Sequence, residues 1–115
     1  MGRKSMKALD KEWRQQAESY GLFDQKHFRQ ALEAYDYQVQ LAQRLRERID
    51  QEGTSIFIPV GKDNEKMVSN PAIADLNKAE LLAQKIRIEL DGKMKEACVI
   101  AQEMKRKEAT DNELL

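Results

Sequence analysis

Residues 24–52 read DQKHFRQALEAYDYQVQLAQRLRERIDQE, and the fold class follows from the spacing of the apolar side chains in this stretch. A helix over this range would be about 43 Å long, with Asp24 as its N-cap. Its narrow apolar seam predicts packing against one or two partner helices, much as in a coiled coil. The seam recurs every three or four residues, the period of one helical face: Phe28, Leu32, Tyr35, Val39, Ala42, Leu45 and Ile49.

A partner for this helix begins at Asn70-Pro71. Asn is a favoured N-cap, and Pro is favoured at the first helical position, where its missing N–H has no cost. Asp91-Gly92 interrupts the pattern and predicts the end of this helix. We therefore expect helices over 24–52 and 71–91 to form an antiparallel hairpin. The seam of the second helix consists of Ile73, Leu76, Ala79, Ala83, Ile86 and Leu90.

The segment 54–69, between the two helices, has a different character. Thr54 to Val60 is rich in β-branched and aromatic residues, the residues 61–64 have turn chemistry, and Met67-Val68 can form a return strand. This pattern predicts a short β-hairpin at the tip of the helical hairpin, with Pro59 on an edge.

Two further helices are expected at the ends of the chain. The first covers 5–20 within an N-terminal segment 1–21, with Ser5 as its cap and Gly21 at its end. The second covers 93–109, with a weak seam of small residues and methionines. The expected fold is a single, mainly α domain over 1–115: a long antiparallel helical hairpin, a short β-hairpin excursion at its tip, and flanking N- and C-terminal helices.

Composition excludes several functional classes. Charged residues make up 35% of the 115 residues, compared with about 25% in an average globular protein, yet the formal net charge is +0. Any DNA contact must therefore come from local clusters of cations. No apolar run approaches the ~18 residues of a membrane span, and the N-terminus lacks the apolar core of a signal peptide. We expect an intracellular protein with no membrane partner.

The sequence also predicts no enzyme activity. The five glycines are isolated, so neither a Walker loop nor a dinucleotide loop occurs. The single cysteine cannot form a disulfide within the chain, and one histidine with one cysteine cannot make a usual zinc site. His27 and Cys98 are better explained as surface and packing residues, and the Asp10/Glu12 pair is a weak metal candidate. We expect no catalytic residue, no metal and no cofactor.

Three basic clusters are candidates for DNA contacts, because phosphate binding needs several cations on one surface. The densest is near the N-terminus, a second lies within 44–48, and a third is Lys105-Arg106-Lys107. Each is also compatible with a solvated helix face. Arg44 and Arg48 are four residues apart and share a face. The candidate DNA-binding residues are Arg3, Lys4, Lys7, Lys11, Arg14, Arg44 and Arg48.

Apolar residues off the helical seams are candidates for contacts between subunits. Trp13, Tyr20 and Tyr35 have core spacing, whereas Tyr37 falls outside the seam. Two strands alone are marginally stable, so the β-hairpin is expected to lean on helices or on another subunit. The candidate interface residues are Tyr37, Ile56, Phe57, Ile58, Leu82 and Ile88.

The order of several short motifs over residues 9–92 resembles that of phage terminase small subunits. These motifs are Glu12-Trp13-Arg14, Tyr20-Gly21-Leu22-Phe23, Asp24 with Ala31-Leu32-Glu33-Ala34-Tyr35, Gly53-Thr54-Ser55-Ile56-Phe57-Ile58-Pro59, Asn70-Pro71-Ala72-Ile73, and Ile86-Arg87-Ile88-Glu89-Leu90. Many members follow the last motif with a Gly-Leu-Thr-Pro-like turn, whereas this chain has Asp91-Gly92-Lys93-Met94.

The resemblance implies a role in packaging viral DNA. Small terminase subunits form oligomeric rings, recognise phage DNA and regulate the terminase large subunit, which carries the ATPase and nuclease. The expected location is the cytoplasm of a bacterial host. Two other interpretations stay open: a non-catalytic helical adaptor that oligomerises without touching nucleic acid, and a helical DNA-binding regulator. The long helix over 24–52 speaks against the compact helix-turn-helix that a regulator would need.

Overall fold

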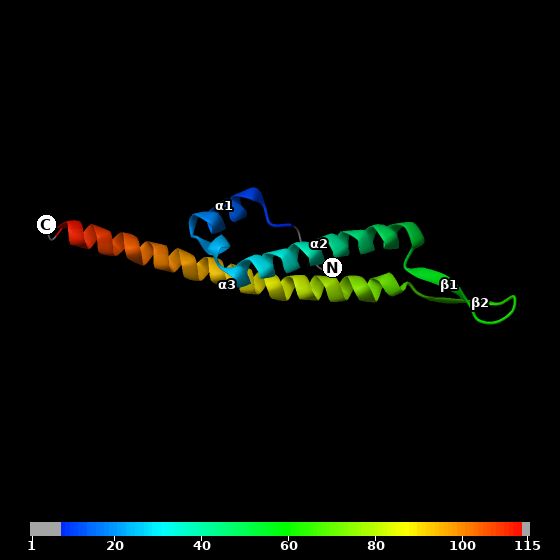
Figure 1. Cartoon of the computed structure of the whole chain (residues 1–115). Coiled ribbons are helices and arrows are strands. Elements are labelled where there is room, and N and C mark those ends of the chain that lie inside the picture. The colour runs from blue at the N-terminus through cyan, green and yellow to red at the C-terminus, as the bar shows by residue number, and fades with distance from the viewer. Residues whose placement is uncertain (1–7, 114–115) are drawn as a thin grey trace.

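The computed structural model describes residues 8–113 of the chain. The elements in order are α1 (Lys11–Ser19), a 3₁₀ turn η1 (Leu22–Asp24), α2 (Lys26–Glu52), β1 (Ser55–Pro59), β2 (Glu65–Ser69) and α3 (Pro71–Glu113). Figure 1 shows α2 and α3 running side by side and antiparallel, with the two strands beyond one end of the pair. The expected fold class, a mainly α helical hairpin with a β-hairpin at its tip, is confirmed.

The core of the hairpin lies where the apolar seams predicted it. All the seam residues of α2 are buried except Ile49, which is half-buried. On α3, Ala79, Ala83 and Leu90 are at most 2% exposed. The alanines let the two helices approach closely, and the larger side chains of α2 fill the space opposite them. The 3.6-residue period was therefore sufficient to identify this core.

Aromatic stacking holds α1 against the hairpin. The Trp13 ring stacks on Phe28 of α2, with ring centroids 5.9 Å apart and an interplanar angle of 8°. Phe23 of η1 meets Phe28 edge-on at 5.8 Å. The Arg87 guanidinium of α3 lies 5.9 Å from the Trp13 ring centroid, a cation–π arrangement. Together these contacts fix α1 and η1 beside the N-terminal end of α2.

The starts of the first two helices differ from the expectation. The first helix begins at Lys11, because Asp10 has extended backbone (φ −75°, ψ 171°) and its side chain accepts a bond from Trp13 N; the expected cap, Ser5, lies outside the described residues. Gly21 adopts the expected left-handed conformation with φ 73°. Asp24 does not cap α2, because it belongs to η1, and the N-cap is Gln25.

The expected break at Asp91-Gly92 is wrong. A single helix, α3, runs from Pro71 to Glu113, so the predicted helices 71–91 and 93–109 are one element of about 64 Å. A glycine inside a helix costs only about 1 kcal/mol relative to alanine. Leu90 and Met94 are both buried on either side of it, and their packing offsets that cost.

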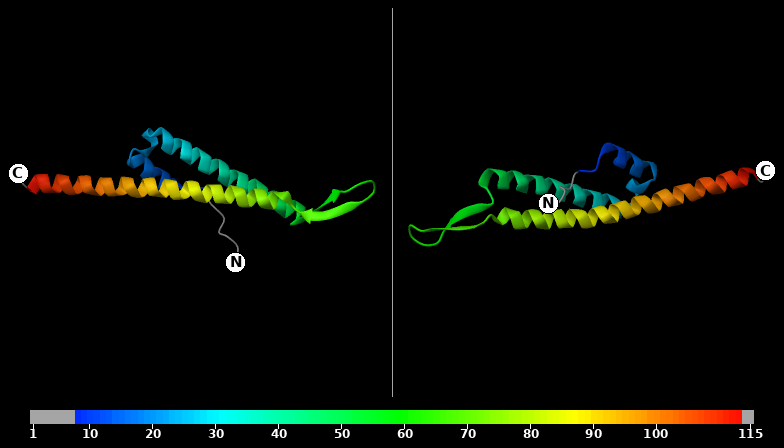
Figure 2. Two further views of the ribbon diagram at one scale, coloured as in Figure 1. Left: turned by 90° about the horizontal axis from the view of Figure 1, so that it is seen from below. Right: turned by 180° about the vertical axis from the view of Figure 1, so that it is seen from behind.

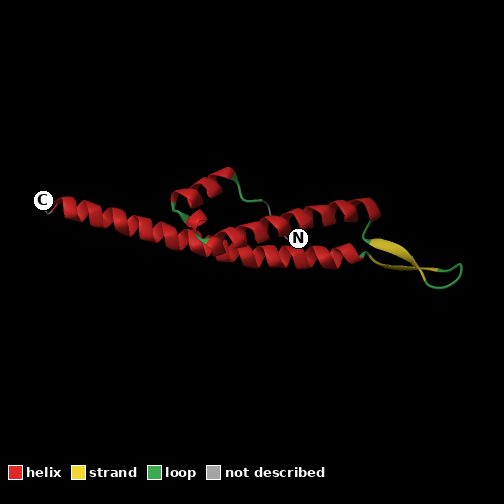
Figure 3. Cartoon of the chain, in the orientation of Figure 1, coloured by secondary structure: helices red, strands yellow, loops and turns green. Residues whose placement is uncertain are grey.

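The β-hairpin forms over the expected segment. β1 and β2 pair antiparallel, with Phe57 opposite Met67 and Ile56 opposite Val68. Figure 3 shows that the strands project beyond the helices. Asn70 anchors their base: its backbone N–H donates to Thr54 O at 2.9 Å, and its side-chain Nδ2 donates to Gly53 O at 2.9 Å. As predicted, Asn70 also caps α3, since its Oδ1 accepts from Ala72 N.

The molecule is long and thin, as the further views in Figure 2 show, with principal extents of 88 × 30 × 19 Å. Its radius of gyration is 22.0 Å, compared with about 13 Å for a compact domain of this length. A chain of this shape buries little surface per residue. Among the described residues, no helix is both long enough and apolar enough to cross a membrane.

Candidate DNA-binding and assembly surfaces

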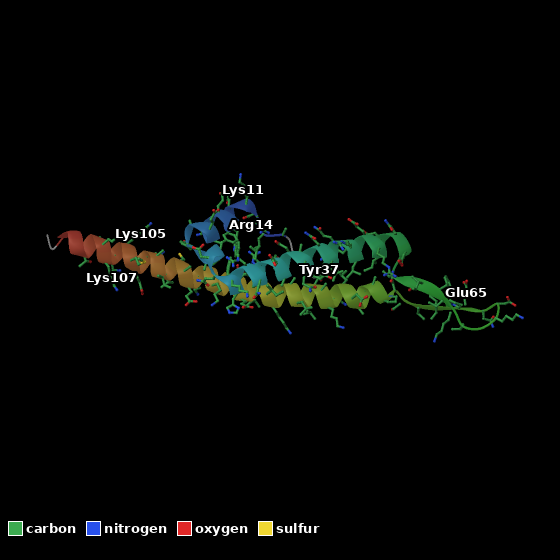
Figure 4. The ribbon with its side chains drawn as sticks, viewed as in Figure 1. Lys11, Arg14, Tyr37, Glu65, Lys105 and Lys107 are labelled. Carbon is green, nitrogen blue, oxygen red and sulfur yellow. The ribbon has the colours of Figure 1, made fainter. Side chains whose placement is uncertain are left out.

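The N-terminal basic cluster is only partly visible, because Arg3, Lys4 and Lys7 lie outside the described residues. Lys11 is exposed in the first turn of α1 and makes no ion pair with any described residue. Arg14, by contrast, is half-buried: its Nη2 lies 2.8 Å from Asp36 Oδ1, and its Nε donates to Leu9 O at 3.1 Å. Figure 4 shows Lys11 pointing away from α1 and Arg14 lying between α1 and α2. Arg14 therefore joins α1 to α2, and Lys11 remains available.

The three arginines of the cluster at 44–48 on α2 have three different environments. Arg44 is exposed and has no ion pair within residues 8–113. Arg48 pairs with Glu52 one turn later, with Nε 2.6 Å from Oε1, and this hydrogen bond raises the pKa of Arg48. Arg46 turns to the other side and binds the buried Glu80 of α3. Arg44 and Arg48 share a face, as expected, but only Arg44 is unpaired there.

The third cluster lies at the far end of the molecule. Lys105, Arg106 and Lys107 are exposed on the last turns of α3. Figure 4 places Lys105 and Lys107 on the projecting part of α3, well away from Lys11 and from the β-hairpin. The cations of one chain do not converge on a single surface within the described residues. An anion-binding surface of useful charge density therefore needs residues 1–7, a second chain, or both.

The candidate interface residues are mostly exposed, as an interface requires. Tyr37 is 59% exposed and Ile88 is 73% exposed. Phe57 on the β-hairpin and Leu82 on α3 are 61% and 43% exposed. Ile58 is 36% exposed, and Ile56 is half-buried. Removal of large apolar side chains from water would stabilise a contact between subunits.

Sequence reasoning missed several exposed apolar residues. The sequence indicated Met67 only as part of a return strand, yet its side chain is 59% exposed. The strand register identifies Met67 as a candidate interface residue, because it lies directly opposite Phe57. The other exposed apolar residues lie on α3: Leu81, Val99, Ile100 and Met104.

Two grooves accompany these residues. The first, which we name the α2/α3 groove, has a volume of about 270 Å³. It is lined by Gln38, Leu41, Leu45, Asp75, Lys78, Ala79 and Leu82. The second, of about 290 Å³, lies between the end of α1, η1 and the projecting part of α3. Both are open and apolar, and both suit a packed side chain more than a polar small molecule.

The residues that the sequence offered as chemical candidates are spread over three helices in the described part of the chain. No group of three or more His, Cys, Asp or Glu side chains is placed to bind a metal among them. His27 is exposed on α2, and Cys98 is half-buried on α3. Burial lowers the pKa of Arg87, but the hydrogen bonds to Asp91 and Tyr35 raise it by more, so the net shift is upward. The Arg87 guanidinium lies over the Trp13 ring, where it serves packing.

Comparison with known proteins gives no independent assignment. No family model matches the chain, and neither the curated proteins nor the solved structures contain a match.

Proposed function

We propose that this chain is the small subunit of a phage terminase, the oligomeric component that recognises phage DNA and regulates the large ATPase/nuclease subunit. In this role it acts in the cytoplasm of a bacterial host, and its partners are further copies of itself, phage DNA and the large subunit. It performs no catalysis itself.

The observation that carries this proposal is the elongated, one-sided protomer. The α2/α3 hairpin leaves a series of apolar side chains uncovered, from Phe57 at one end to Met104 near the other. A molecule 88 Å long with a core two helices wide gains stability by lateral contact with copies of itself. The order of elements also matches the order of motifs on which the resemblance to small terminase subunits rests.

DNA binding in this proposal depends on repetition. One chain contributes Lys11 on α1 and Arg44 on α2 as exposed cations without an ion pair among the described residues, and the net charge is +0. In an assembly each cation is repeated in every subunit. Several weak phosphate contacts then act on one duplex, and their free energies combine.

The test combines light scattering with DNA titrations by fluorescence anisotropy at several salt concentrations. We expect one species of many subunits whose logarithmic affinity for duplex DNA falls linearly with the logarithm of salt concentration. Lys11→Ala and Arg44→Ala should each weaken binding to all sequences and reduce the salt slope by about one per contacting subunit. Lys85→Ala, an exposed cation on α3, is the matched control and should leave the slope unchanged.

A second candidate, an oligomeric adaptor that does not bind nucleic acid, is favoured by one specific observation. Two of the seven candidate cations are neutralised inside the chain, Arg14 by Asp36 and Arg48 by Glu52. An assembled protein without salt-dependent DNA affinity would support the adaptor and overturn the terminase proposal.

A further inference from the structure

The β-hairpin carries apolar side chains on both faces. The strand register places Phe57 and Met67 on one face, which we name the Phe57 face, and Ile56 and Val68 on the other. Ile56 and Val68 are half-buried, whereas Phe57 and Met67 are 61% and 59% exposed. A two-stranded hairpin is marginally stable in water. The Phe57 face therefore gains most from a cover.

The α2/α3 groove is a second apolar surface that the chain leaves open. Ala79, 2% exposed, and Leu82, 43% exposed, are among its lining residues. It is set back from the hairpin by about eight residues of α3, or roughly 12 Å along the helix axis. Its rim carries Asp75 and Lys78, neither of which forms an ion pair with any residue in 8–113.

The hairpin of a given chain cannot reach its own groove. Its base is tied to the helix ends by the two bonds of Asn70, to Thr54 O and Gly53 O. The strands extend away from the helices, as Figures 1 and 3 show. Figure 4 places Glu65 on the projecting hairpin, far from Tyr37 at the middle of α2. The cover for each surface must therefore come from another molecule.

We propose that the Phe57 face of one copy docks in the α2/α3 groove of a second copy. The two charges that meet are opposite: Glu65 lies on the Phe57 face, two residues from Met67 on β2, and Lys78 lies on the groove rim. Glu65 forms no ion pair with the described part of its own chain. The apolar pair Phe57 and Met67 fills the groove while this rim contact sets its orientation.

A second copy fits better than an unrelated partner, because the chain carries both halves of the contact. The two surfaces are different patches, so the contact is heterologous: a docked pair still presents one free hairpin and one free groove. Such a contact can join many copies, and it gives a ring when the rotation between neighbouring copies closes. This inference deepens the proposed function and rests on its assembly step, for which it names the surfaces.

Disulfide trapping tests the contact directly, because a disulfide requires Cα atoms within about 7 Å. In a Cys98→Ala background, the double variant Met67→Cys/Leu82→Cys should give a reducible ladder of many linked subunits on mild oxidation. Each single variant should give dimers at most. Met67→Cys/Ile88→Cys is the matched control, since Ile88 is 73% exposed but does not line the groove, and it should give no ladder. All three positions are exposed, and unchanged melting by circular dichroism would verify folding.

Light scattering of the same samples separates the two levels of failure. An assembled protein without the Met67–Leu82 ladder, or with an equal ladder in the Ile88 control, would overturn this contact and leave the proposed function standing. A monomer at all concentrations would overturn both.

A charge exchange gives a second readout. Glu65→Lys and Lys78→Glu should each weaken assembly by about two- to fivefold, as expected for an exposed ion pair, and the double variant should restore it. If assembly of the double variant were weakened by the combined effects of the two single substitutions, the docking orientation that pairs these residues would be overturned.

Discussion

Asn70 connects three elements through one side chain and its backbone. It is 1% exposed, and it binds Gly53 O at the end of α2, Thr54 O before β1, and Ala72 N in the first turn of α3. Its amide side chain donates to one carbonyl and accepts from an N–H at the same time. Asn70 therefore sets the angle at which the β-hairpin leaves the helices.

We expect Asn70→Ala to lower the free energy of unfolding by about 2 kcal/mol. The loss combines a helix cap, worth about 0.5–2 kcal/mol, with a Gly53 carbonyl left without its partner. Urea unfolding monitored by circular dichroism would measure it. Asn77→Ala, at an exposed position within α3, should change the free energy of unfolding by no more than about 0.5 kcal/mol. Equal effects of the two substitutions would contradict this role.

At the scale of elements, the continuity of α3 is the largest difference between the structure and the expected fold. Helices 71–91 and 93–109 were expected to be separate, because Asp-Gly is a common end signal. A single helix instead carries the hairpin core into a projecting segment that α2 does not cover. That segment carries exposed apolar residues, Ile100 and Met104, and the basic cluster at 105–107. Continuity thus makes the far end of α3 a rigid extension of the hairpin.

Gly92→Ala tests this continuity. A Cβ atom at Gly92 would meet nothing within 4 Å, so we expect a gain of up to about 1 kcal/mol in the free energy of unfolding, from helix propensity alone. The gain should appear as a higher melting temperature in circular dichroism at 222 nm. Gly21→Ala is the contrasting control: Gly21 has φ +73°, so this variant should be destabilised. Destabilisation by Gly92→Ala would mean that the helix ends there in solution.

At the scale of the whole molecule, stability depends on what the elongated shape leaves uncovered. The chain exposes 9128 Å², compared with about 6,500 Å² for a typical monomer of 13.3 kDa. Its core is two helices wide along α2, with α1 covering one part. Assembly would remove apolar surface from water and so add to the free energy of unfolding.

We therefore expect the melting temperature to rise with protein concentration, because association stabilises the folded state by mass action. Calorimetry or circular dichroism over a hundredfold range of concentration would measure this rise. The charge variant Glu65→Lys should melt at a lower temperature than the unaltered chain at low concentration and approach it at high concentration. A melting temperature independent of concentration would indicate that the monomer is stable by itself.

The sequence alone determined the local features of this protein. The apolar period of α2 and the first half of α3, the Asn70-Pro71 start, the β-hairpin segment and the left-handed Gly21 all follow from rules that act over a few residues, so they could be predicted. For the same reason the exposed state of Tyr37 followed from its place outside the seam.

Only the tertiary structure decided the features that depend on contacts between distant residues. Packing of Leu90 and Met94 carries α3 through Gly92 against its local preference. Arg14 leaves the candidate DNA surface because Asp36, 22 residues away, neutralises it, and Arg46 is held by Glu80. These outcomes could not be read from spacing, because a local pattern states what a residue prefers, whereas its partner depends on which elements the fold brings together.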